Sequence, residues 1–202
     1  IPMTKEQDVW SVKVPHIKAG QKYGYRAYGD YNPEQGLFFN PQKLAVDPYG
    51  LEVSSVIKDW ETDALDGGNN IDSAPYMPKS VVVEQNPFKD AAKYPYLHQK
   101  PQIPWGKNSI FEMHVRNFTI QNFNLPEDER GRLKALTNPQ ILDYLEQLGV
   151  NNVELMPITP TCPGRFLRQD EGYTDNWGYN PYCHFAVNPR YGTHEDLKAV
   201  IN

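Results

Sequence analysis

The feature that most restricts the fold is a strand–helix–strand pattern between residues 109 and 158. The apolar runs SIFEMHV, residues 109–115, and NNVELMPI, residues 151–158, are bounded by polar turns, and each predicts a strand. Between them, Asn138 and Pro139 form the usual start of a helix, an N-cap followed by Pro at the first helical position. A helix that joins two strands at this separation indicates parallel strands and a right-handed crossover.

The helix between these strands has a clear apolar face and a clear end. Gly149 stands where a helix C-terminus favours a left-handed residue. A second helix is expected to begin after Thr193 as its N-cap. Two strands and one complete helix cannot cover both faces of a parallel sheet, so the sequence predicts a fragment that depends on further sequence. The apolar positions at helical spacing are Ile141, Leu142, Leu145 and Leu148.

The first part of the chain has a different pattern. Alternating hydrophobicity over residues 10–14 and 23–27 predicts two antiparallel strands, and KSVVVE at 79–84 predicts another. Residues 53–57 fit either a short strand or a helical turn. The sequence thus predicts an antiparallel β-domain over residues 1–84, incomplete because a sandwich usually has about seven strands.

Residues 85–105 are expected to link this β-domain to the strand–helix–strand part, residues 106–202. The stretch has four Pro and no hydrophobic period. Its aromatic residues are expected to anchor it in an ordered path across the surface. They are Phe88, Tyr94, Tyr96 and Trp105.

Composition excludes some functions and favours others. The net charge of -5 argues against a nucleic-acid partner, and no apolar run approaches the roughly 20 residues that span a bilayer. Cys162 and Cys183 favour free thiols in a reducing compartment, hence a cytoplasmic location, with a single bridge as the alternative. The 18 Pro, 14 Gly, 13 Tyr and 4 Trp indicate rigid turns that carry aromatic rings, as ligands with apolar faces such as sugars require.

The sequence offers few candidates for catalysis. No His stands at metal-ligand spacing, so neither a metal nor a cofactor is expected. His114 follows the first strand of the pair, and a structural role is the simpler interpretation. Glu112 and Glu154 lie within the strands, and Glu112 is expected to be buried and paired. The carboxylates of the loop at 170–175 are expected to be solvated.

The stretch WGYNP, residues 177–181, follows the second strand after a long loop. Gly178 permits a tight turn, and Pro181 restricts Asn180 to extended conformations. Such a turn holds Tyr179 rigidly, so that its ring could receive a ligand without an ordering cost. Spacing alone leaves open whether the rings of Trp177 and Tyr179 bind a ligand or only pack the loop against the core.

Several stretches, taken in order, resemble the glycogen debranching and isoamylase-like group of glycoside hydrolase family 13. WGYNPYCHFAVNPRYGTHEDLKAVI, SIFEMHVRNFT and LGVNNVELMPI resemble the family's segments around the first two barrel strands. YGYRAYGDYNPEQGLFFNPQKLAVDPYG and DSAPYMPKSVVV resemble its family-48 carbohydrate-binding module. The resemblance implies an immunoglobulin-like antiparallel β-sandwich, incomplete here, followed by the first βα units of a truncated TIM (β/α)8 barrel.

The resemblance also implies a site and a reaction. Tyr179 would stack on the sugar at the cleavage subsite, and Trp177 and Asn180 would line the same subsite. The family hydrolyses α-1,6 branch points of glycogen or limit dextrin by a retaining mechanism that uses two carboxylates. The family places these acids after later barrel strands, so this segment is expected to hold no catalytic residue and to be inactive alone.

Three alternatives to a debranching enzyme remain from the sequence. The chain could be a non-catalytic glucan-binding module, for which Trp10 and Trp60, with Tyr23 and Tyr25, are the candidate contacts. It could also be part of another family-13 enzyme, a branching enzyme or a pullulanase. In each case the expected partner is an α-glucan, with neither nucleic acid nor membrane. The third alternative is a truncated, poorly functional product whose exposed sheet edge favours self-association.

Overall fold

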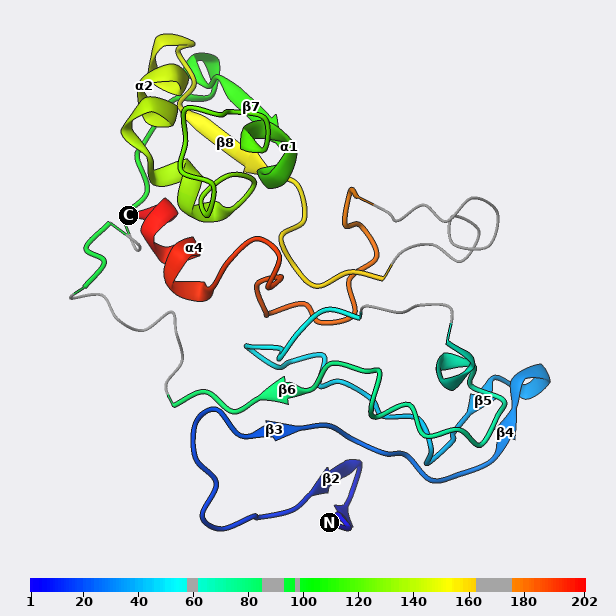
Figure 1. Cartoon of the computed structure of the whole chain (residues 1–202). Helices are drawn as coiled ribbons and strands as arrows, with labels where there is room; N and C mark the ends of the chain where they lie inside the picture. Colours follow the sequence, from blue (N-terminus) through cyan, green and yellow to red (C-terminus); the bar gives the residue numbers. More distant parts are fainter. Residues whose placement is uncertain (58–61, 85–92, 97–98, 163–175) are drawn as a thin grey trace.

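The computed structural model describes residues 1–57, 62–84, 93–96, 99–162 and 176–202. Trp60, Phe88 and the loop carboxylates at 170–175 therefore lie outside the described residues. Within the described ranges the structure is mixed, with short antiparallel strand pairs in its first part and a parallel pair flanked by helices in its second (Figure 1). No helix of the described part is long and apolar enough to cross a membrane.

The first part consists of three antiparallel strand pairs. These are β1 (Thr4–Glu6) with β2 (Val9–Ser11), β3 (Lys22–Tyr23) with β6 (Ser80–Val81), and β4 (Tyr31–Asn32) with β5 (Leu37–Phe38).

The predicted strand runs at 10–14 and 23–27 each contain part of a short strand, but their pairing was predicted wrongly. β2 folds back on β1, because Gln7 adopts a φ of 53° and turns the chain between them. β3 pairs instead with β6, which is the strand expected within residues 79–84 and whose residues are both buried. Of residues 53–57, Val53 forms only an isolated antiparallel bridge to Ser80.

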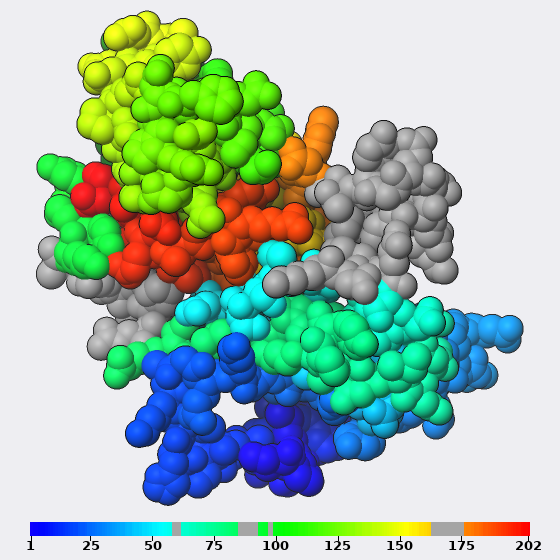
Figure 2. Space-filling view, viewed as in Figure 1, coloured from blue at the N-terminus to red at the C-terminus, as the bar shows by residue number. Residues whose placement is uncertain are grey.

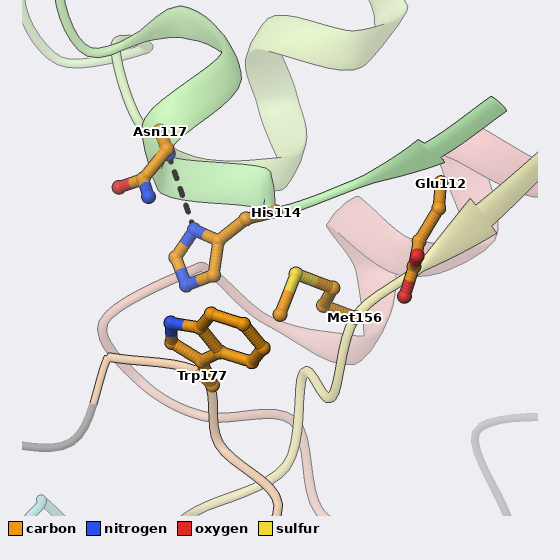
Figure 3. A pocket seen from close by; sticks show the side chains of 5 residues that line it. All are labelled: Glu112, His114, Asn117, Met156 and Trp177. Carbon is orange, nitrogen blue, oxygen red and sulfur yellow. Dashed lines mark hydrogen bonds between the residues drawn. The ribbon is translucent and has the colours of Figure 1, made fainter.

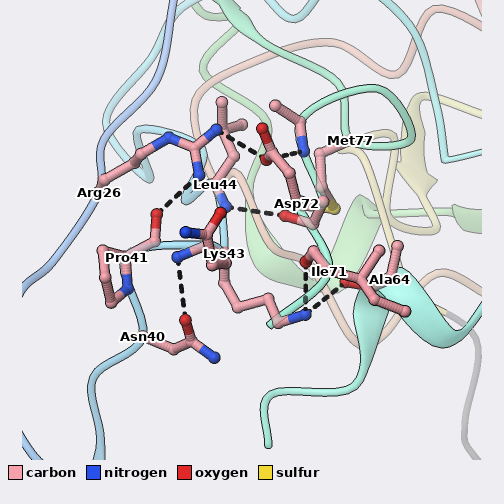
Figure 4. Close-up of polar contacts among 12 residues, drawn as sticks. Arg26, Asn40, Pro41, Lys43, Leu44, Ala64, Ile71, Asp72 and Met77 are labelled. Atoms are coloured by element: carbon pink, nitrogen blue, oxygen red, sulfur yellow. Dashed lines mark hydrogen bonds and ion pairs between the residues drawn. The ribbon is translucent and has the colours of Figure 1, made fainter. Parts of the chain in front are cut away.

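Long polar side chains bind the loops of this first part together. The Lys43 ammonium donates to the carbonyl oxygens of Ala64 and Ile71, each at 2.9 Å (Figure 4). Arg26 donates to the Pro41 carbonyl oxygen and pairs with the Asp72 carboxylate, both at 2.7 Å. Three of these bonds reach backbone carbonyls of loops and one reaches the Asp72 carboxylate, so they fix irregular segments that have few ladder hydrogen bonds.

The predicted strand–helix–strand unit is confirmed. Strands β7 (Ile110–Met113) and β8 (Asn152–Leu155) are parallel, and helix α2 (Pro139–Gln147) lies between them in the chain. The Asn138 side chain accepts from the backbone N–H of Gln140 at 3.1 Å, as an N-cap does. Gly149 has a φ of 73°, as predicted for the end of this helix.

The main core lies on one face of this parallel pair. Two further helices, α1 (Val115–Thr119) and α4 (His194–Ile201), flank it, and the chain between α1 and α2 contains the 3-10 helix η4 (Leu133–Thr137). Thr193 caps α4 through a reciprocal capping box with Asp196, which confirms the predicted start. The buried core residues are Met113, Val115, Leu125, Leu133, Ala135, Leu136, Ile141, Leu145, Val187 and Tyr191.

The other face of the parallel pair is exposed, and this overturns one expectation. Glu112 is exposed rather than buried and paired within a strand. Ile110, two positions before it in β7, and Glu154, its register partner in β8, lie on the same face and are also exposed. The reason is that the described helices cover only one face of this pair.

The predicted anchoring of the segment at 85–105 holds for one of its aromatic residues. Tyr94 is buried, and its hydroxyl donates to the Glu195 carboxylate at 2.6 Å. Tyr96 and Trp105 are 58% and 85% exposed, so their rings are not buried anchors. Trp105 instead begins a short 3-10 helix, η3 (Trp105–Lys107).

Candidate functional site

The candidate site lies where the parallel strands end. β7 runs directly into His114, and β8 runs into residues 156–162. Residues 177–180, here called the aromatic turn, lie against both ends. Because parallel strands present their carboxyl ends at the same edge, these three segments meet there.

Gly178 gives the aromatic turn its shape. Its φ is 86°, a left-handed value, and an added Cβ would lie 3.0 Å from the carbonyl oxygen of Pro157. A residue with a side chain would therefore meet both backbone strain and a clash with a backbone atom. The turn passes this close to the end of β8 because position 178 is glycine.

Asn180 fastens the turn to the segment after β8. Its side-chain amide donates to the Cys162 carbonyl oxygen at 3.0 Å. Its own carbonyl accepts from the Cys162 N–H at 2.9 Å and from the Thr161 hydroxyl at 3.0 Å. Asn180 thus braces the turn, while the flanking rings of Trp177 and Tyr179 stay 66% and 61% exposed.

Tyr179 reaches back to the exposed face of the parallel pair. Its hydroxyl donates to the Glu112 carboxylate at 3.4 Å. Partial desolvation of the hydroxyl, followed by the charges of Glu112 and Glu154, raises the pKa of Tyr179 above its ordinary value. The phenol therefore stays protonated at neutral pH and acts as a donor, while its ring is available to a ligand.

His114 ties α1 to the start of the aromatic turn. Its Nδ1 accepts from the backbone N–H of Asn117 at 3.1 Å, so Nε2 carries the proton of the neutral ring. Nε2 donates to the carbonyl oxygen of Asn176, and the Tyr191 hydroxyl lies 3.3 Å from it. The imidazole is thus held by both nitrogens, as the structural role expected from the sequence requires.

These side chains border a hollow with a volume of about 240 Å³. Figure 3 shows the indole of Trp177 facing the imidazole of His114, with the thioether of Met156 beside them. Its walls are Glu112, His114, Asn117, Met156 and Trp177. An apolar wall with a carboxylate and ring N–H groups suits a ligand that has both apolar faces and hydroxyl groups.

The structure brings together some of the predicted site residues. Trp177 lines the hollow, and Tyr179 contacts Glu112 at its edge. Trp10 is 61% exposed in β2, at the far end of the molecule from β7 and β8 (Figure 1). Trp60, the other predicted contact in the β-domain, lies outside the described residues.

Glu112, Asn117 and Met156 were missed as site residues by sequence reasoning. The available signal was positional, because each lies in a predicted strand or just beyond the end of one. Glu112 and Glu154 are also direct neighbours in the parallel register, so the structure places two carboxylates side by side where the sequence indicated none. In the described part of the chain no three His, Cys, Asp or Glu side chains gather to hold a metal ion.

Comparison with known proteins gives this geometry a context. A family model for carbohydrate-binding module 48, the isoamylase N-terminal domain, matches residues 1–50. The glycogen debranching enzyme of Enterobacter sp. (strain 638) is 39% identical over 195 residues, which are 95% of this chain and 28% of that protein. That of Salmonella typhi is 38% identical over 92% of this chain and 28% of its own length. The chain thus spans less than a third of the length of these relatives.

Solved structures of pullulanases share the fold. A pullulanase from Anoxybacillus sp. LM18-11, complexed with maltotriose, matches with a TM-score of 0.61 and 25% identity over 98% of this chain and 25% of its own. The apo pullulanase from Paenibacillus barengoltzii matches with a TM-score of 0.60 and 22% identity over 98% of this chain and 27% of its own. By sequence, the chain is therefore similar to glycogen debranching enzymes over less than a third of their length, and its residues 1–50 match the isoamylase N-terminal domain.

Proposed function

We propose that this chain supplies the sugar-binding aromatic turn of a glycogen debranching enzyme, which hydrolyses α-1,6 branch points of glycogen or limit dextrin. The observation that carries the proposal is the rigid, exposed Tyr179 beside a hollow at the ends of two parallel strands. The near-complete coverage of this chain by its match to debranching enzymes gives the substrate class. An α-glucan is accordingly the proposed partner, and the cytoplasm the proposed location.

The proposal extends to the finer architecture. We assign β7, α2 and β8 to the first βα units of a TIM barrel, because the strands are parallel and the candidate site lies at their carboxyl ends. We assign residues 1–84 to an immunoglobulin-like family-48 module, residues 85–105 to a linker and residues 106–202 to the barrel. The three antiparallel pairs, β1 with β2, β3 with β6 and β4 with β5, support this division, as does the family match over residues 1–50.

In this account the chain binds the sugar and orients it. The ring of Tyr179 stacks on the apolar face of a glucose unit, and Trp177 forms the adjoining wall. Asn180 and Gly178 hold both rings in place before the ligand arrives, so binding does not have to order them. The two carboxylates of the retaining mechanism come from outside this segment, and Glu112 has the role of holding the Tyr179 hydroxyl.

The test compares variants of the protein expressed from its complete reading frame, acting on a branched limit dextrin. Tyr179→Ala is expected to raise the activation free energy behind kcat/KM by about 1–3 kcal/mol, roughly a 5- to 150-fold loss, the scale of a lost aromatic stacking contact. Tyr179→Phe keeps the ring and is expected to remain near the wild type. Equal rates for all three proteins, or a wild type without debranching activity, would reject the proposal. The segment of residues 1–202 alone is expected to show no turnover.

A second candidate function is glucan binding without catalysis, favoured by the exposed Trp10 and the match to a carbohydrate-binding module. Retention of this chain on insoluble starch, measured with and without Trp10→Ala and Trp60→Ala, tests it. Loss of retention in these variants, with Tyr179→Ala still retained, would favour the binding module over the enzyme. A branching enzyme is distinguished because it forms α-1,6 bonds instead of hydrolysing them, and a pullulanase because it hydrolyses pullulan.

A further inference from the structure

The residues that follow the aromatic turn pack against the first part of the chain. The side chain of Cys183 is fully buried, and its Sγ lies 3.2 Å from the Gly50 carbonyl oxygen and 3.5 Å from that of Asp47. Val53 and Ala186 complete a small apolar cluster around it. Figure 2 shows this contact between the cyan segment near residue 50 and the orange to red segment. Residues 46–53 are here called the β-side segment.

Two further contacts join the β-side segment to the same stretch. The backbone N–H of His184 donates to the Pro48 carbonyl oxygen at 3.3 Å. The rings of Tyr49 and Phe185 are stacked, with centroids 5.6 Å apart and planes inclined by 18°. Each residue from 183 to 185 thus has a contact to the β-side segment, and these residues follow the aromatic turn within a few positions. The segment therefore controls the direction in which the chain leaves the turn.

The β-side segment is itself fixed to the antiparallel strands. The backbone N–H of Asp47 donates to the Ser80 hydroxyl at 3.0 Å, and the Tyr23 hydroxyl donates to the Asp47 carboxylate at 2.7 Å. A Cβ at Gly50 would lie 3.1 Å from both the Asp47 carbonyl oxygen and the Ser80 hydroxyl. These contacts join the segment to Tyr23 and Ser80 of the antiparallel strands.

We propose that the β-side segment positions Tyr179 for the sugar, with Tyr49 as the positioning residue. The aromatic turn itself is anchored at Pro157 and Cys162, after β8, and residues 183–185, which follow it, are anchored at the β-side segment. Tyr49 acts through Phe185 and the backbone that leads back to Tyr179, not by touching the reacting atoms. The inference rests on the proposed function, and it assigns the β-domain a part in forming the active site.

A double-mutant cycle separates positioning from direct sugar contact by Tyr49. The protein from the complete reading frame is assayed on limit dextrin with Tyr49→Ala, Tyr179→Ala and both. Tyr49→Ala is expected to lower kcat/KM about five-fold in the wild type and to have almost no effect once Tyr179 is Ala, because coupled residues are not additive. Tyr49→Phe keeps the stacked ring and should restore the wild-type value. Tyr28→Ala removes a ring that is 80% exposed elsewhere in the first part of the chain, and it serves as the control.

The outcomes distinguish the two proposals. If the wild type is active and the two losses simply add, Tyr49 does not work through Tyr179 and the positioning role is rejected. If Tyr49→Ala has no effect in an active enzyme, the positioning role is rejected too. An inactive wild type rejects the proposed function and this inference with it. A fall in melting temperature together with additive losses in kcat/KM, and hence no coupling to Tyr179, would identify Tyr49 as merely structural.

Discussion

At the scale of single residues, the aromatic turn shows how backbone chemistry prepares a binding surface. Gly178 adopts a left-handed conformation, and the side-chain amide of Asn180 donates to the Cys162 carbonyl oxygen. With the backbone held in this way, the rings of Trp177 and Tyr179 remain exposed to solvent. The exposed rings are therefore held by the backbone of Gly178 and by the hydrogen bonds of Asn180.

Gly178→Ala is expected to destabilise the chain of residues 1–202 by about 1–2 kcal/mol, because alanine is strained in the left-handed region. The new Cβ would also press on the Pro157 carbonyl oxygen at 3.0 Å. Gly106→Ala is the matched control, since a Cβ there meets nothing within 4 Å. Chemical denaturation measures both changes. Equal stability of the two variants would show that the turn does not depend on this glycine.

The lowered pKa of Glu195 predicts that the free energy of unfolding depends on pH. Hydrogen bonds from Lys198, then Lys93 and the Tyr94 hydroxyl, lower the pKa of Glu195 from 4.5 to about 2. The folded state therefore prefers the ionised form, so the contribution is full above pH 4.5 and is lost as pH falls towards 2. Its size is expected to be at most about 1 kcal/mol, because the side chain is 53% exposed and screened by solvent.

Melting temperatures of the wild type and Glu195→Gln, measured from pH 7 to pH 2, test this dependence. The variant is expected to be less stable at pH 7, and the difference should vanish as the pH approaches 2. Glu127→Gln, at an exposed carboxylate, is the control and should show no such convergence. A difference that is constant with pH would contradict the assignment.

At the scale of elements, the sequence predicted the βαβ unit well because its signals are local. Asn138, Pro139 and Gly149 mark the ends of α2 by their own backbone preferences. The strand pairs of the first part were predicted less well, because strands of two or three residues carry almost no period and their partners are chosen by distant contacts. Ser80 pairs with Tyr23 across more than fifty residues, which no local pattern signals.

Some residues of the candidate site could likewise be predicted from local sequence signals, and others could not. The aromatic turn was visible in the sequence, since Gly178 and Pro181 restrict the backbone locally. Its neighbours Glu112 and Met156 were not, because an unpaired sheet face and the meeting of two strand ends are properties of the tertiary structure. The burial of Glu112 was predicted wrongly for this reason.

Helix α2 offers a direct comparison of two leucines that the sequence pattern treats alike. Leu145 is 9% exposed in the main core and Leu142 is 50% exposed. Leu145→Ala is expected to cost about 2–4 kcal/mol of unfolding free energy, and Leu142→Ala less than about 1 kcal/mol. Urea denaturation of the chain measures both. Similar losses at the two positions would mean that α2 presents a different face to the core.

At the scale of the whole molecule, the β-domain and the strand–helix–strand part meet beside the aromatic turn. Cys183, the stacked Tyr49 and Phe185, and the His194 ring N–H that donates to the Leu51 carbonyl all lie at this contact. Cys183 is a buried thiol that fills this contact. The chain that follows the aromatic turn is thus in contact with the first part of the molecule.

The central claim is that the aromatic turn of this chain contacts the sugar, and the indole N–H signals of its 4 Trp residues test it most directly. Maltotriose is titrated into the chain of residues 1–202, and the signals are followed by NMR and assigned with Trp→Phe variants. The account predicts a saturable shift of the Trp177 signal that Tyr179→Ala weakens, while the 85% exposed Trp105 does not respond. A Trp177 signal that stays fixed while Trp10 or Trp60 shifts would contradict it.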